Sequence, residues 1–171
     1  MKINIQLYLC FILVFVVNYA FSQNVHVDDF DNGSIANFPI DWDKRGDQAM
    51  KEYLVAKDTT GNKNLCVSFL NSNIFILKQL KVDLVEYPYL NWSWRANDLP
   101  TDGDESVKKY CDAAACIAIV LKLLKFRPRS IKYTWSTTLD IEVGTKSPYA
   151  FWPSRSDIIV LESGNDELGN W

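Results

Sequence analysis

The sequence predicts a mainly β fold, an antiparallel β-sandwich of the jelly-roll type. Residues that favour turns recur at short intervals, and Asp31-Asn32-Gly33-Ser34 is the strongest example. From Tyr89 to Ala96, apolar and polar side chains alternate, which is typical of a strand with one buried face. The segment from Ile131 to Thr138 is rich in β-branched and aromatic residues, which favour strands. Many short strands separated by turns are typical of a sandwich or jelly roll.

The other elements follow from the same signals. The expected strands, in chain order, are 25–30, 53–56, 65–70, 74–77, 89–96, 113–124, 131–138, 141–145 and 157–162. Residues 58–64 combine Asp, Thr, Gly and Asn, so they are expected to turn the hairpin between the second and third strands. The apolar segment 113–124 matches a helix as well as a strand, and we expect a central strand because its neighbours are β. Residues 97–106 are polar and acidic and are expected to form a long surface loop.

The N-terminus has the pattern of a secretory signal peptide. Lys2 precedes an apolar stretch that reaches Val17, and the small residues Ala20 and Ser22 follow it. We therefore expect cleavage after Ser22, a single domain over 23–171, and a periplasmic or secreted protein without a membrane span. The alternative is a retained membrane anchor, but the fully apolar run is shorter than the ~20 residues that a span needs.

Length and composition restrict the classes of protein to which the chain can belong. Its 171 residues suit one domain, and 48% apolar with 23% charged residues fit a globular chain. The net charge of −3 argues against nucleic acid and anionic membranes as partners. His26 is the one histidine, and the sequence has no P-loop, GxGxxG, HExxH, CxxC or EF-hand motif. Composition therefore names no reaction, and it leaves the oligomeric state open.

Three cysteines follow the predicted cleavage site: Cys66, Cys111 and Cys116. An odd number leaves at least one thiol unpaired. If their segment is extended, the Cα atoms of Cys111 and Cys116 lie ~16 Å apart, which is too far for a disulfide. Buried free thiols and a bridge from Cys66 to one of the other two both remain open.

Several short segments, taken in order, resemble a known family. The matching residues are Phe30 to Ser34, Val82 to Leu84, Tyr87 to Arg95, Leu99-Pro100, Lys109, Asp112, Ala115 to Ile117, Tyr133 to Ser136, Gly144-Thr145, Pro148-Tyr149, Ser163-Gly164 and Leu168 to Trp171. Together they resemble the bacterial exported proteins of the domain of unknown function 3047 family. This resemblance implies a secreted or periplasmic β-sandwich and no established activity.

The sequence departs from the family pattern at three places. Cys111 stands where the family has the first of two acidic residues, and Cys116 stands where it has an arginine. Similar proteins continue past the position of Trp171, so we expect this chain to lack a closing segment. Any site that uses those groups would differ in this chain.

Asp28, Asp29 and Asp31 form the first candidate site. Three carboxylates beside Asn32 supply the hard oxygen ligands that Ca²⁺ prefers, so a structural calcium ion is the one cofactor we expect. The alternative is a solvent-exposed turn in which the aspartates bind their own backbone.

Aromatic side chains form the second candidate, and its members are Trp92, Trp94, Trp135, Tyr87, Tyr89, Tyr133 and Tyr149. Flat rings stack on sugars, and nearby Asp, Asn and Arg side chains bind hydroxyl groups. Trp92 and Trp94 are two residues apart and suit a core better, whereas Trp152, beside Pro153, is the better exposed platform. The residues predicted to bind a glycan are Trp152, Trp135, Arg95, Asp98 and Asp112.

The third and fourth candidates are charged. Asp112 and Asp104 would form the acid/base pair of a glycan-active enzyme if their carboxyl groups lie ~5–9.5 Å apart. Alternatively, Asp98, Asp102, Asp104 and Glu105 are solvated, and Asp112 pairs with Arg95 or Lys109. A basic set would attract acidic polysaccharide or phosphate, or else form a charged hairpin end. Its members are Lys122, Lys125, Arg127, Arg129 and Lys132.

Three functional hypotheses follow from these candidates. The leading one is a non-catalytic binding domain for carbohydrate or cell-envelope glycan, because an aromatic-rich β domain in an exported chain lacks catalytic motifs. The second is the carboxylate-based enzyme that uses Asp112 and Asp104. The third is a structural or partner-binding envelope protein.

Overall fold

The computed structural model describes residues 24–68, 74–121, 128–150 and 155–171. The chain divides into two compact units, Met1–Leu90 and Asn91–Trp171, which we describe separately. The predicted signal peptide lies outside the described residues, and the single domain over 23–171 stays a prediction. Among the described residues, none of the helices has the length and apolar character needed to cross a membrane.

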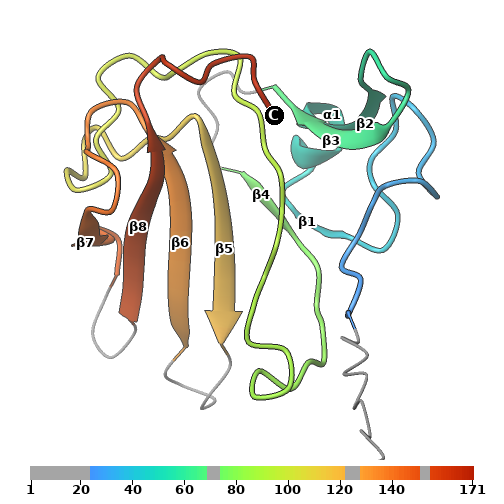
Figure 1. The fold of residues 1–171 in the computed structure, drawn as a ribbon, viewed down its shortest axis with the longest axis horizontal. Coiled ribbons are helices and arrows are strands. Elements are labelled where there is room, and N and C mark those ends of the chain that lie inside the picture. Colours follow the sequence, from blue (N-terminus) through green and yellow to red (C-terminus); the bar gives the residue numbers. More distant parts are fainter. Residues whose placement is uncertain (1–23, 69–73, 122–127, 151–154) are drawn as a thin grey trace, which may run out of the picture. The chain divides into compact units, whose positions relative to one another are not determined.

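The first unit contains two small antiparallel sheets and one short helix. Strand β1 (Asp43–Arg45) pairs with β4 (Phe75–Leu77), and β2 (Tyr53–Lys57) pairs with β3 (Lys63–Val67) (Figure 1). Helix α1 (Ala49–Glu52) precedes β2 directly. The hairpin β2–β3 confirms the predicted one, and the carboxylate of Asp58 holds its turn by accepting the Thr60 and Asn62 amides at 2.8 and 3.0 Å.

The strand predicted over 25–30 is wrong. The carboxylates of Asp28 and Asp29 accept the backbone N–H groups of Phe30 and Asp31 at 2.8 and 3.0 Å. Aspartate side chains thus take the amides that a strand would offer to a neighbour. The result is extended chain that leads into the predicted turn, which Gly33 closes by donating to the Phe30 carbonyl at 2.9 Å.

The core of the first unit lies on one side of β2. Ala49, Tyr53 and Val55 are buried, with Val55 only 1% exposed. A Cβ atom at Gly33 would lie 2.7 Å from Cγ2 of Val55, so only glycine allows this turn to lie against the strand. The packing of the turn on β2 therefore explains why the sequence has glycine at position 33.

The second unit contains one four-stranded sheet. Its strands are β5 (Ala115–Leu121), β6 (Arg129–Ser136), β7 (Gly144–Lys146) and β8 (Arg155–Ser163), in the order β5-β6-β8-β7 (Figure 1). The β5–β6 and β7–β8 pairs are antiparallel, but β6 and β8 are parallel, with an irregularity between Thr134 and Trp135. The mainly β prediction is confirmed, and the predicted antiparallel pairing holds for every strand pair of the described residues except β6–β8. A parallel pair needs a long crossover, and the segment between β6 and β8, which includes β7, supplies it.

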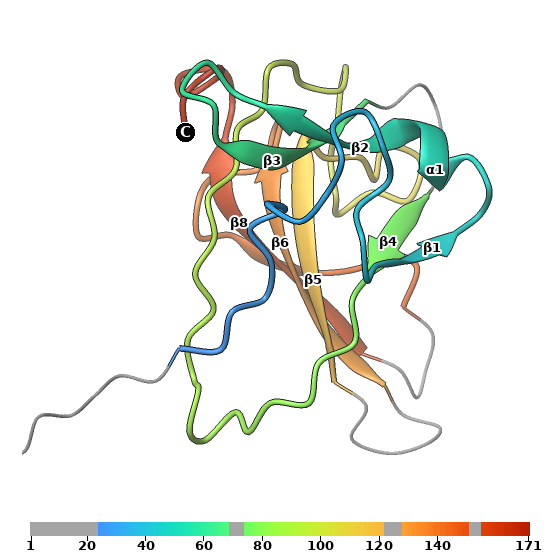
Figure 2. The same cartoon turned by 90° about the vertical axis from the view of Figure 1, so that its right-hand side faces the viewer.

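Strand β5 is correctly predicted as a strand but lies at an edge of the sheet instead of its centre. Figure 2 looks onto this edge and shows the twist of the strands. The side chains of β5 alternate between half-buried and exposed along the whole strand. The apolar run therefore covers one face of the sheet and leaves the other side of the strand in contact with water.

Aromatic rings cover the β6 strand on one face. Trp92 lies 5.4 Å from Tyr133 and 5.7 Å from Trp94, and Trp94 lies 6.3 Å from Trp135, all between ring centroids. Residues 91–95 have the predicted alternation, since the two tryptophans are half-buried and Asn91, Ser93 and Arg95 are exposed, but Leu90, predicted on the buried side, is exposed. The segment 89–96 forms no strand in the structure, so the predicted strand is wrong. Its extended chain is held instead by ring packing.

Candidate ligand-binding surface

The loop that follows the aromatic segment is anchored to the end of β6. Three consecutive hydroxyl side chains donate hydrogen bonds to it. The pairs are Ser136 Oγ to Glu105 Oε2 (2.6 Å), Thr137 Oγ1 to the Pro100 carbonyl (2.9 Å) and Thr138 Oγ1 to the Gly103 carbonyl (2.8 Å). A loop predicted to be a long, solvated connection is therefore fixed at three points.

Glu105 is the deepest of these contacts. The sequence predicts it in a solvated loop, but its side chain is 0% exposed, so that prediction is wrong. Ser136 Oγ donates to Glu105 and also accepts the Leu139 amide at 3.1 Å, which fixes the direction of its proton. Oε1 of Glu105 has no hydrogen-bond partner among the described residues. The Ser-Thr-Thr run that begins at the last residue of β6 was the available signal, because three donors in a row need acceptors.

The same loop also closes on itself. The Tyr110 carbonyl accepts the amides of Asp104 and Asp112, each at 2.7 Å. A Cβ atom at Gly103 would lie 2.9 Å from the Asp112 carbonyl and 3.0 Å from Thr137 Oγ1. The two ends of the segment 104–112 are thereby held together, so its outer side chains have a defined position.

Those outer side chains combine aromatic rings with cations. Tyr110 is 43% and Tyr149 is 47% exposed. Tyr149 Oη donates to the Lys108 carbonyl at 2.9 Å, and Lys108 Nζ lies 5.5 Å from the centroid of the Tyr149 ring. Lys109 Nζ lies 4.8 Å from the Tyr110 ring centroid. We call Lys108, Lys109, Tyr110 and Tyr149 the tyrosine–lysine surface. It offers flat rings beside hydrogen-bond donors.

The predicted glycan-binding residues lie in different environments. Arg95, Asp98 and Asp112 are exposed. The Arg95 guanidinium lies 4.9 Å from the ring of Trp171, which is 57% exposed. Trp135 is 2% exposed and its indole donates to the Gly164 carbonyl at 3.1 Å, so its faces lie in the core. Trp152 lies outside the described residues.

The acidic pair Asp104 and Asp112 shares one loop. Oδ1 of Asp104 accepts the amide and the hydroxyl of Ser106 at 2.9 and 2.5 Å, which is a turn contact. Asp112 is exposed, and its carboxylate accepts the amide of Ala113 at 2.9 Å. In the described part of the chain, Asp112 forms no ion pair with Arg95 or Lys109. The role of Asp104 and Asp112 as an acid/base pair stays a prediction.

The predicted calcium ligands have other partners. Oδ2 of Asp28 accepts Lys78 Nζ and Trp42 Nε1, each at 2.7 Å, and Asp29 lies 3.2 Å from His26. Burial alone would raise the pKa of Asp28, but the bonds from Lys78, Trp42 and Phe30 hold it below its ordinary value. Over the described ranges, no group of three or more acidic, histidine or cysteine residues is placed to hold a metal ion. The calcium ion stays a prediction.

The three cysteines are free thiols in the structure. Cys66 and Cys116 are exposed, and Cys111 is half-buried. Burial raises the pKa of Cys111, while the charge of Lys132 acts in the opposite direction. In the predicted basic set, Arg129 is exposed and Lys132 half-buried, and Lys122, Lys125 and Arg127 lie outside the described residues.

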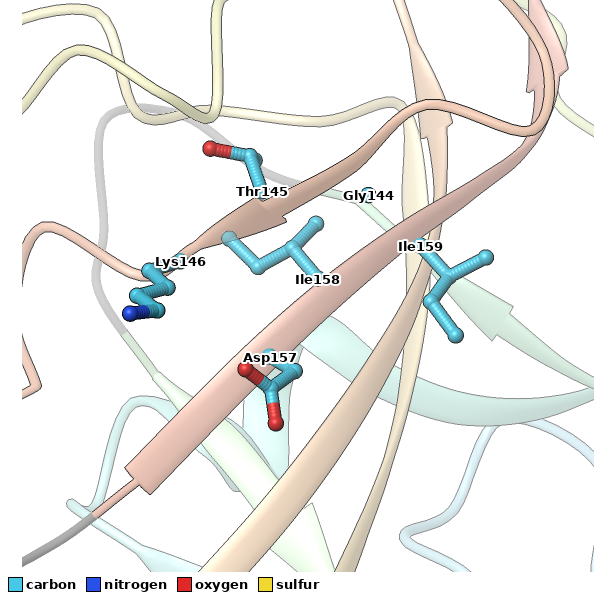
Figure 3. A pocket seen from close by; sticks show the side chains of 6 residues that line it. All are labelled: Gly144, Thr145, Lys146, Asp157, Ile158 and Ile159. Carbon is cyan, nitrogen blue, oxygen red and sulfur yellow. The ribbon is translucent and has the colours of Figure 1, made fainter.

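A separate hollow of about 460 Å³ lies between β7 and β8 (Figure 3). Its lining residues are Gly144, Thr145, Lys146, Asp157, Ile158 and Ile159. Figure 3 shows the side chains of Thr145 and Asp157 pointing to opposite sides. Because ligand sites need polar groups that converge, this hollow is a poorer candidate than the tyrosine–lysine surface.

The fold and its anchored loop define a mainly β protein with an exposed aromatic surface. The chain belongs to the family described as "Protein of unknown function (DUF3047)", whose sequence pattern matches residues 41–171. This finding confirms the resemblance seen in the sequence. No curated protein matches the chain, and no solved structure does.

Proposed function

We propose that this protein is an exported, non-catalytic domain that binds carbohydrate, such as a cell-envelope glycan. The observation that carries the proposal is the tyrosine–lysine surface, where Tyr110 on the anchored loop is 43% exposed and Tyr149, which bonds that loop, is 47% exposed. Sugar rings stack on aromatic faces, and lysine ammonium groups donate to sugar hydroxyls.

The anchoring of the loop supports binding in a second way. A loop that is ordered before the ligand arrives loses little conformational entropy when it binds. The bonds from Ser136, Thr137 and Thr138 order the inner part of the loop, which includes Glu105. The bond from Tyr149 to the Lys108 carbonyl orders its exposed part. Asp112, at the end of the same loop, adds an acceptor for hydroxyl groups.

The other predicted features extend this proposal. Arg95, stacked on Trp171, forms a second exposed aromatic contact beside Asp98, and Trp152 follows Tyr149 closely in the sequence. Cleavage after Ser22 would deliver the domain to the periplasm or the exterior. The proposal also includes a β-sandwich of the jelly-roll type and a structural calcium ion at Asp28, Asp29 and Asp31.

Retention on immobilised envelope glycans tests the proposal. Tyr110→Ala and Tyr149→Ala remove a ring each, and we expect each to weaken retention by roughly fivefold, since one aromatic contact contributes about 1 kcal/mol. Tyr89→Ala is the matched control, because Tyr89 is 86% exposed in the other unit. Retention that is equal for all three variants would contradict a binding role for this surface.

The carboxylate-based enzyme is the alternative, and the observation in its favour is that the backbone amides of Asp104 and Asp112 both donate to the Tyr110 carbonyl, so the two residues lie near each other in the loop. If it is right, Asp112→Asn abolishes glycan hydrolysis and leaves the thermal melt unchanged. Hydrolysis that persists in the variant would exclude Asp112 as its acid or base.

A further inference from the structure

The two edges of the four-stranded sheet differ in how they are protected. Strand β7 is three residues long and contains Gly144 and Lys146. Strand β5 is seven residues long and reads Ala-Cys-Ile-Ala-Ile-Val-Leu, without charge, proline or glycine. Short length and lysine are the usual means by which a sheet edge is kept from pairing. The β7 edge has both, whereas β5 has neither.

Strand β5 is also regular and accessible. Its register with β6 is unbroken from Ala115 to Leu121. No other strand among the described residues pairs with its second edge. Cys116, Ala118 and Val120 are exposed on one side of the strand, Val120 at 58%. An apolar edge without a register break is a template for a further strand.

We propose that the β5 edge pairs with β5 of a second copy of this chain, antiparallel and about a two-fold axis at Ala118. Each residue then faces the residue equally far from Ala118 on the other copy. Cys116 faces Val120 of the other copy, and Ile117 faces Ile119. Exposed positions thus meet exposed positions, and half-buried ones meet half-buried ones.

The composition of β5 makes a second copy the fitting occupant. In a symmetric pair, a charged residue near the two-fold axis would lie close to the same charge on the other copy, which is costly. Strand β5 has no charged residue, so self-pairing carries no such penalty. The pairing would join two four-stranded sheets into one and extend the apolar side of the edge across the dimer.

Cross-linking tests the register directly. In the whole chain with Cys10→Ser, Cys66→Ser and Cys111→Ser, Val120→Cys leaves cysteines only at 116 and 120. These two cannot bridge within one strand, because four residues span ~13 Å and a disulfide needs Cα atoms within ~7 Å. Mild oxidation with oxidised glutathione, which is reduced as each disulfide forms, is expected to give a dimer that dithiothreitol releases. Thr145→Cys on β7, in the same background, is the control.

Sedimentation over a concentration series tests the interface without cross-links. The unaltered chain is expected to dimerise, and Val120→Lys should raise the dimer dissociation constant by roughly tenfold or more. Val120 is exposed, so its substitution leaves the fold intact, which a thermal melt checks. A monomer at every concentration, a dimer that Val120→Lys leaves unchanged, or equal cross-linking of the β7 control would overturn the proposal.

Discussion

Asp28 and Glu105 are acidic side chains in different units, and each is withdrawn from water in its own way. Asp28 keeps 15% of its side-chain surface and receives a lysine ammonium and an indole N–H. Glu105 is fully buried and receives one serine hydroxyl on one of its oxygens. A buried acid without a cation depends more heavily on each hydrogen bond. The comparison therefore indicates that Glu105 contributes more to the stability of the fold than Asp28 does, although the sequence places it in an ordinary acidic loop.

The largest effect is expected from Glu105→Ala. The variant removes the acceptor of the Ser136 hydroxyl, leaves a cavity and releases the inner anchor of segment 104–112. We expect the free energy of unfolding in urea to fall by about 3 kcal/mol. Asp166→Ala, an exposed acid in the same unit, should change it by less than about 0.5 kcal/mol. Equal effects from both variants would mean that burial of Glu105 adds no stability.

The next effect is expected from Asp28→Asn. The amide still accepts hydrogen bonds but no longer neutralises Lys78, which is 20% exposed. We expect a loss of about 1–2 kcal/mol, since hydrogen bonds to charged groups contribute more than neutral ones. Adding Lys78→Met should recover part of it, and a double-mutant cycle measures the coupling. A coupling of zero would show that the pair is a contact without energetic consequence.

The contribution of Asp28 to stability should be visible in the acid pH dependence of unfolding. Its pKa in the folded protein lies below the ordinary value of 3.8, so the unfolded chain takes up the proton first as pH falls. The stabilisation by Asp28 is complete above about pH 4 and is lost as pH falls through the folded pKa. Urea melts between pH 6 and pH 2 should therefore show a smaller acid loss in Asp28→Asn than in the unaltered chain. Parallel curves would contradict the lowered pKa.

The smallest effect is expected from Trp42→Phe. The ring of Trp42 stacks 6.1 Å from Phe30, and phenylalanine keeps much of that contact. The variant loses the indole N–H that Asp28 accepts, while the Lys78 bond remains. We expect a loss of about 0.5–1 kcal/mol in urea unfolding, below that of Asp28→Asn. A larger loss than that of Asp28→Asn would place the main contribution of this site in the ring packing.

The binding surface was only partly predictable. The sequence singled out Asp112 and Arg95 as polar candidates and included Tyr149 among the aromatic residues that could contact a sugar. It could not show that Tyr149 bonds the Lys108 carbonyl, because these residues are far apart in the chain and meet only when the loop folds onto β6. It also gave Trp135 a binding role that its 2% exposure does not allow.

The sequence alone was enough to determine those elements that depend only on residues close together in the chain. The β2–β3 hairpin follows from its turn residues, and the alternating burial of 91–95 follows from a period of two. The tertiary structure alone decided the strand order, the parallel β6–β8 pair and the burial of Glu105. Each of these depends on contacts between distant segments, where packing and hydrogen-bond satisfaction outweigh local preference. The acidic composition of the loop predicted that it is exposed. The hydroxyl groups of Ser136, Thr137 and Thr138, at and just after the end of β6, determined where the loop lies.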